Sequence, residues 1–149
     1  MRSVELSHDF DKLVRAFEAA PDQTRDMVRR QVKMAVRDIQ EEARDNHRFI
    51  TRSGLTEKSI MSLVKDNQGT VMLTNSIAVY QHEGTKPHLI VPRFKKVLRF
   101  AVNKEFVFSR RVQHPGIKAD PFLYRAADKM LPTIETRFQA ALDNLVEDL

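Results

Sequence analysis

The spacing of apolar side chains predicts a strand and then a helix in the first 20 residues. Val4 and Leu6 alternate with charged residues, which is the pattern of a short edge strand. From Asp9 the period lengthens, and apolar residues at positions 10, 13, 14 and 17 form one helical stripe. This helix is expected to end before Pro21, because the residue that precedes a proline avoids the helical conformation.

A second, longer helix is predicted to open at Pro21. Asp22 and Asp26 in its first turns would complement the positive end of the helix dipole. Charged side chains occupy its other faces, so this helix should bury one side only. The apolar stripe consists of Val28, Val32, Ala35, Val36, Ile39 and Ala43.

The C-terminal segment has the same design. Pro132 either starts a helix there or kinks a longer helix that begins near Pro121. The two long helices would pack on each other or lie side by side on one sheet. The apolar stripe after Pro132 consists of Ile134, Phe138, Ala141, Leu142, Leu145 and Leu149, and the earlier part would add Phe122, Leu123, Ala126, Ala127 and Met130.

Between the long helices the pattern predicts two hairpins. Residues 62–65 and 71–75 flank a turn signal at 67–69. Residues 98–102 and 106–109 alternate on either side of Asn103-Lys104, and asparagine tolerates the positive φ of a tight turn. We expect one face of this second hairpin to be aromatic and aliphatic and buried in the core, and the other face to carry basic residues.

These elements predict an α+β fold, in which an antiparallel sheet of hairpins packs with two long amphipathic helices. The 149 residues suit one domain, and no stretch has the composition of a linker, so we expect a single domain over 1–149. No apolar run approaches the ~18 residues of a membrane span, and the N-terminus lacks the apolar core of a secretory signal.

The net charge of +5 comes from one segment. Residues 86–118 hold nine basic side chains and one acidic side chain, whereas residues 1–85 hold 13 of each and residues 119–149 hold three basic and six acidic. Like charges this close repel, so phosphate, an acidic partner surface, or water with counterions should lie opposite them.

Residue types that carry chemistry are sparse. The chain has no cysteine, and its five histidines lack the spacing of a metal site. The four glycines are too far apart for a phosphate-binding loop, and no serine lies in a nucleophile elbow. Glu83 could serve as a general base, but a lone glutamate before a turn is more often a cap or an ion-pair partner. We therefore expect no enzyme activity, no cofactor and no metal.

The basic hairpin, residues 93–111, leaves a nucleic-acid-binding module as an alternative. A basic two-stranded ribbon can lie in a groove and bind phosphate without sequence preference. Arg99, Arg110 and Arg111 could equally pair with the acidic C-terminal helix of a neighbouring copy.

Three segments and the hairpin, taken in order, resemble a known family. The segments are residues 51–60 (TRSGLTEKSI), 78–85 (AVYQHEGT) and 112–123 (VQHPGIKADPFL), with the hairpin before the last one. Together they resemble the head–tail joining or tail-completion proteins of long-tailed double-stranded DNA bacteriophages. Two departures are small: Ser53-Gly54 stands where Thr-Gly is usual, and Asn103-Lys104 replaces a glycine-rich hairpin tip.

The resemblance implies a structural, non-enzymatic virion protein that is made in the host cytoplasm and resides in the neck or tail. It would assemble with itself into a ring, with a hexamer favoured, between head-connector and tail-tube proteins, while DNA passes through the lumen and touches it without sequence preference. No membrane contact is expected. A ring subunit needs two unlike surfaces that meet, and the basic segment and the acidic C-terminal helix would supply them.

The candidate residues for this structural role combine turn-forming positions of the family-like segments with arginines of the hairpin. We expect Gly84 and Gly116 to hold turns that other residues would strain, and Phe122 to pack the last helix onto the sheet. The complete set is Tyr80, Glu83, Gly84, Thr85, Arg99, Arg110, Arg111, His114, Pro115, Gly116, Pro121 and Phe122.

Overall fold

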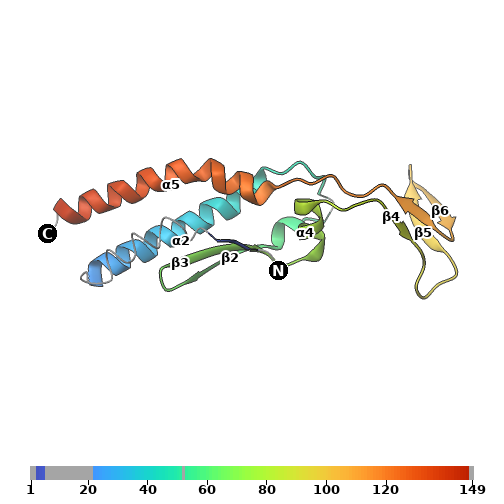
Figure 1. The fold of residues 1–149 in the computed structure, drawn as a ribbon, viewed down its shortest axis with the longest axis horizontal. Helices are drawn as coiled ribbons and strands as arrows, with labels where there is room; N and C mark the ends of the chain where they lie inside the picture. The colour runs from blue at the N-terminus through green and yellow to red at the C-terminus, as the bar shows by residue number, and fades with distance from the viewer. Residues whose placement is uncertain (1–2, 6–21, 52, 148–149) are drawn as a thin grey trace.

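The chain forms an elongated α+β structure, with a layered body at one end and a projecting arm at the other (Figure 1). The computed structural model describes residues 3–5, 22–51 and 53–147. The predicted fold class, antiparallel hairpins with long helices, is confirmed. The elements are β1 (Ser3–Glu5), α2 (Asp22–Asp45), α3 (Leu55–Lys58), β2 (Ile60–Lys65), β3 (Gln68–Leu73), α4 (Ser76–Glu83), β4 (His88–Ile90), β5 (Leu98–Val102), β6 (Glu105–Ser109), β7 (Val112–His114) and α5 (Phe122–Glu147).

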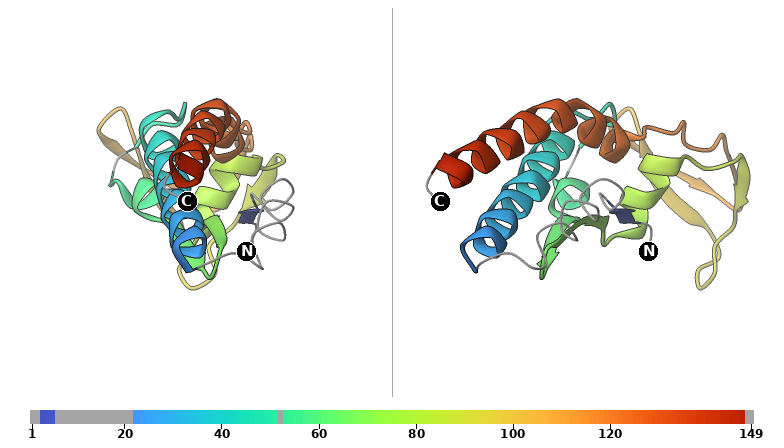
Figure 2. Two further views of the ribbon diagram at one scale, coloured as in Figure 1. Left: turned by 90° about the vertical axis from the view of Figure 1, so that its left-hand side faces the viewer. Right: turned by 60° about the vertical axis from the view of Figure 1, so that its left-hand side comes forward.

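The body has three layers, with α2 between α5 and a three-stranded sheet (Figure 2). The strand order is β1-β3-β2, and both pairings are antiparallel. Of the two arrangements that the sequence left open, the helices pack on each other, and only α2 makes extensive contact with the sheet.

The predicted stripe of α2 is confirmed, since all six of its members are buried. These side chains meet Ile60 and Val71 from the sheet and Phe122 and Ile134 from α5. The predicted edge strand is confirmed as β1, where Val4 pairs with Val71. The helix expected over residues 9–17 lies outside the described residues.

The C-terminal helix is the longer of the two predicted alternatives. α5 starts directly after Pro121 and continues through Pro132. Because proline lacks an N–H, one intrahelical hydrogen bond is missing there. The Thr136 hydroxyl donates to the Pro132 carbonyl at 2.9 Å, which adds a contact one turn later.

The first hairpin is confirmed, but its turn lies one residue earlier than predicted. Lys65 pairs with Gln68, so the turn consists of Asp66 and Asn67, and Asp66 has a φ of 54°. Gly69 belongs to β3, where a Cβ atom would collide with Val36 of α2. This glycine serves the close approach of strand and helix and not the turn.

The arm is a long excursion between α4 and α5. The short strands β4 and β7 pair near its middle, and the hairpin β5–β6 forms its tip (Figure 1). The predicted two-residue turn of this hairpin is confirmed, because Asn103 and Lys104 have φ angles of 48° and 72°.

Candidate protein interface

The base of the arm, which we call the root, is built where two family-like segments meet. Thr85 and Ile117 form an isolated antiparallel bridge, in which the Thr85 N–H donates to the Ile117 carbonyl at 2.9 Å. The Ile117 N–H donates back to the Thr85 carbonyl at 3.1 Å and lies 3.0 Å from its hydroxyl. The root thus joins two chain segments 32 residues apart.

Two glycines make this approach close, and their predicted role is confirmed. Gly84 and Gly116 have φ angles of 76° and 89°, a region that other residues rarely adopt. A Cβ atom on Gly84 would lie 2.7 Å from the Ile117 carbonyl oxygen, and one on Gly116 would collide with the Thr85 carbonyl oxygen. Any side chain at either position would therefore push the two segments apart.

His114 supports the root from the arm side. Its Nδ1 accepts the Gly116 N–H at 3.0 Å, across the exposed Pro115. Its ring stacks on that of His88, the partner of His114 in the β4–β7 pairing, with 5.0 Å between centroids. The root and the β4–β7 pair therefore form one continuous support for the hairpin.

Asp120 anchors the other end of the root to the body, a role that the sequence reasoning missed. Its buried carboxylate accepts the Arg48 backbone N–H at 2.6 Å and a hydrogen bond from the Arg125 guanidinium. Burial by itself would raise the pKa of Asp120, but the hydrogen bonds from Arg125 and Arg48 more than offset it, and the pKa is lowered. An acidic residue two positions before the start of a helix interacts favourably with the helix dipole, and this signal could have drawn attention to it.

Pro121 and Phe122 lie beside this anchor, where α5 begins. Phe122 is fully buried, and its ring contacts His82 at 5.2 Å between centroids. His82 is buried as well, and burial lowers its pKa. Tyr80 and Glu83 are exposed on α4, so the structure does not bring these two side chains into the root.

The hairpin at the tip contradicts the prediction of a buried aromatic face. Phe100, Phe106 and Phe108 are 37%, 60% and 62% exposed. In Figure 1 the hairpin stands clear of the body. Its side chains thus lie outside the core that the described residues form.

The register explains why the aromatic side chains do not share a single face. Phe100 pairs with Val107, and Phe106 pairs with Ala101, so Phe100 points away from the face that holds Phe106. Arg99 pairs with Phe108 on that second face, and its guanidinium lies 4.2 Å from the Phe106 ring centroid. Each face therefore carries exposed apolar groups, and basic and aromatic groups share one of them.

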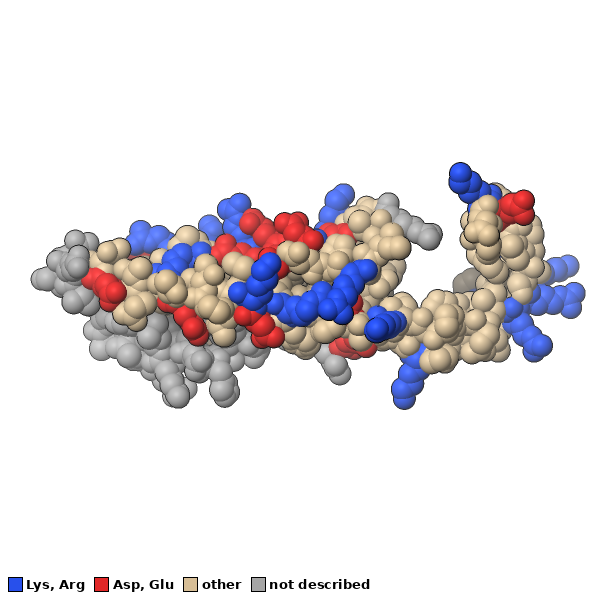
Figure 3. All heavy atoms as spheres, turned by 90° about the horizontal axis from the view of Figure 1, so that it is seen from above, with Lys and Arg blue, Asp and Glu red and all other residues tan. Residues whose placement is uncertain are grey.

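The arm carries nine basic side chains and one acidic side chain, Glu105. Lys and Arg side chains project from it in Figure 3, and most charged groups visible there are basic. None of its nine Lys and Arg side chains forms an ion pair with another described residue. The structure therefore separates Arg99, Arg110 and Arg111 from the root residues and exposes them at the far end of the arm.

The described part of the chain contains neither a cluster of metal ligands nor a membrane-spanning helix. No group of three or more His, Asp or Glu side chains converges there as a metal site would. No helix among these residues has the length and apolarity needed to cross a bilayer.

Comparison with protein-family models, with curated proteins and with solved structures gives no match for this chain.

Proposed function

We propose that this chain is a structural subunit of a bacteriophage neck, which assembles with copies of itself into a ring between head and tail. The observation that carries the proposal is the hairpin β5–β6, whose apolar side chains are exposed. A two-stranded hairpin is marginally stable in water, and exposed apolar patches of this kind mark interaction sites. The family-like segments 78–85 and 112–123 support the same function, because they build the root that holds the hairpin away from the body.

A ring subunit acts by geometry and needs no catalytic group. The role calls for two unlike surfaces, a rigid connection between them, and a lining that DNA can pass. The arm and the layered body supply the two surfaces, and the root supplies the connection. The subunit is accordingly proposed to be non-enzymatic, with neighbouring neck and tail proteins above and below the ring.

The test is assembly of the purified full-length chain. We expect particles of one discrete mass by mass photometry, rings by negative-stain electron microscopy, and restored tail attachment when the protein is added to a phage extract that lacks it. Serine at Phe106 and Phe108 should abolish the particles, whereas serine at Phe94, which is 99% exposed in the preceding loop, should leave them intact. A monomer at every concentration, without restored tail attachment, would contradict the proposal.

A nucleic-acid-binding module is the second candidate, and the open hairpin favours it more than the sequence did. Arg99 above the exposed Phe106 ring resembles a stacking platform for bases in a basic surface. Fluorescence anisotropy with single- and double-stranded DNA separates the two functions. A neck protein should bind DNA weakly at physiological salt, whereas a module should bind tightly with a steep salt dependence.

A further inference from the structure

The tip of the arm presents one face that combines basic and aromatic groups. Arg99, Ala101, Phe106 and Phe108 share this face, which we call the tip face, and all four are exposed. Arg110 and Arg111 follow directly after the hairpin and are exposed too. A partner for the tip face must therefore offer both apolar contact and negative charge.

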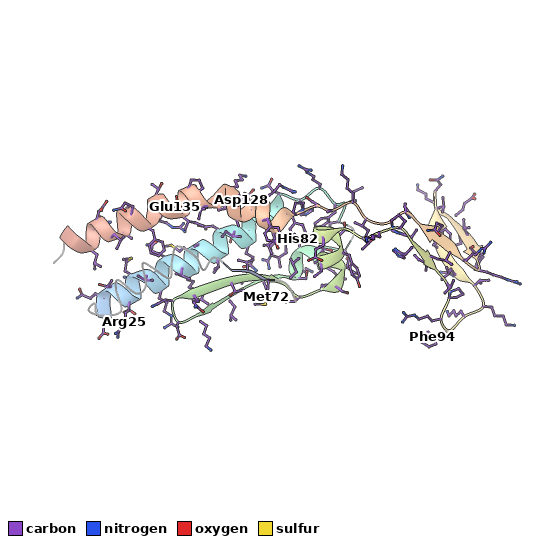
Figure 4. All side chains as sticks on the ribbon, in the orientation of Figure 1. Arg25, Met72, His82, Phe94, Asp128 and Glu135 are labelled. Carbon is purple, nitrogen blue, oxygen red and sulfur yellow. The ribbon has the colours of Figure 1, made fainter. Side chains whose placement is uncertain are left out.

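A surface of that composition exists on α5 of the same chain. Tyr124, Asp128, Leu131 and Glu135 are spaced by four, three and four residues, so they lie along one side of the helix. All four are exposed, and Tyr124 and Leu131 are 47% and 37% exposed. We call this stripe the α5 flank; Figure 4 labels its two carboxylates.

The charges of the flank are not neutralised by the described part of the chain. The three basic residues of α5 are engaged elsewhere: Arg125 with Asp120, Lys129 with Glu42 at 2.7 Å, and Arg137 with Asp38 at 2.6 Å. Asp128 and Glu135 form no ion pair with any other described residue. The flank therefore presents alternating acidic and apolar groups, which is the complement of the tip face.

The two surfaces cannot meet within one molecule. The root, with its close glycine contacts, holds the hairpin at the far end of the arm, apart from α5 in Figure 1. Contact between them therefore joins two copies. Where each copy places its arm on one neighbour and receives the arm of another on its flank, the contact is heterologous, and such contacts generate rings or filaments.

We propose that the tip face of one copy packs on the α5 flank of the next copy, with Phe106 and Phe108 against Tyr124 and Leu131. The arginines of the arm would lie opposite the two carboxylates of the flank. This inference rests on the proposed function and names the surfaces through which the ring forms. DNA is a less suitable partner than a second copy. It would neutralise the basic side chains of the arm, but it would leave the acidic and apolar α5 flank exposed.

Charge reversal on each surface tests the pairing. One variant carries Arg99→Glu and Arg111→Glu, and a second carries Asp128→Arg and Glu135→Arg. Each variant alone should assemble at least about tenfold more weakly than the wild type, because like charges then face each other. These side chains are exposed, so circular dichroism and thermal unfolding should match those of the wild type.

Mixing the two variants is the decisive step. In an equimolar mixture every arm meets a flank of opposite charge, so assembly should return, with the two variants alternating. A matched control carries Lys33→Glu and Lys65→Glu, which change the charge equally on exposed body positions and should leave assembly unchanged. High salt should weaken the wild-type and mixed assemblies alike.

Each other outcome overturns a defined claim. If the wild type assembles and the variants assemble equally well, or if mixing restores nothing, the tip-to-flank pairing is wrong while the proposed function stands. If the wild type never assembles, the proposed function fails. If the arm variant assembles normally but loses binding to DNA, the tip face serves nucleic acid and not a second copy.

Discussion

Phe122 is the residue on which the start of α5 depends. Its ring is fully buried and contacts Phe49 at 5.4 Å and His82 at 5.2 Å between centroids. Phe122→Ala should lower the free energy of unfolding by about 3–5 kcal/mol, because it leaves a cavity. Urea unfolding measures the loss. Phe94→Ala is the matched control and should stay within about 0.5 kcal/mol of the wild type; equal effects at the two sites would refute the packing.

His82 makes stability depend on pH near neutrality. Burial lowers its pKa, and the weaker effects of Glu83 and Asp120, which raise it, do not reverse this. The unfolded chain therefore binds a proton more readily than the folded one. The contribution of His82 is present in full above the ordinary histidine pKa of about 6.5, and it is lost as the pH falls below that value.

A phenylalanine at this position should flatten the pH dependence. Between about pH 7.5 and 5 the wild-type Tm should fall, and the fall should be smaller for His82→Phe, which has no proton to gain. Above pH 5 the lowered pKa of Asp120 keeps its carboxylate ionised, so this anchor adds little to the slope. An equal fall of Tm in the two proteins would show that His82 does not cause the pH dependence.

At the scale of elements, the root holds the arm through backbone contacts that glycine alone permits. Gly116→Ala adds a collision with Thr85 to the strain of a positive φ, whereas Gly54→Ala adds strain only, since no atom lies within 4 Å of its Cβ position. Gly54→Ala should cost about 1–2 kcal/mol, and Gly116→Ala about 1–3 kcal/mol more.

Amide hydrogen exchange localises this difference. The N–H groups of Thr85 and Ile117, which donate across the root, should exchange about tenfold faster in Gly116→Ala, because each 1.4 kcal/mol of local stability is a factor of ten. Gly54→Ala should leave both amides at the wild-type rate. Unchanged protection in Gly116→Ala would show that the root tolerates a side chain.

The elements that the sequence predicts well are those whose signals are local. The α2 stripe, the Pro121 boundary and the Asn103-Lys104 turn all depend on residues a few positions apart. The sequence analysis did not predict which residues share the tip face, although the length of the turn determines the pairing of the two strands. A two-residue turn pairs Val102 with Glu105 and hence Ala101 with Phe106, so Phe100 of β5 and the two phenylalanines of β6 fall on opposite faces.

At the scale of the whole molecule, the separation of arm from body could not be predicted. Alternating apolar residues in a strand predict only that one face of the strand is covered. The pattern does not distinguish a core of the same chain from the surface of a neighbouring molecule. The root depends likewise on contacts between Thr85 and Ile117, far apart in sequence. The family-like segments indicate that the turns at residues 84 and 116 are important for the fold. They do not indicate that the two turns lie side by side.

The rigid root has a consequence for the size of any closed assembly. If the arm of each copy binds the α5 flank of the next, the angle between arm and α5 determines the rotation from one subunit to its neighbour. That rotation determines how many subunits complete a full circle. Gly84 and Gly116 set the angle through their φ values of 76° and 89°. The circumference of the proposed ring would then depend on two backbone positions that lie outside the proposed contact between subunits.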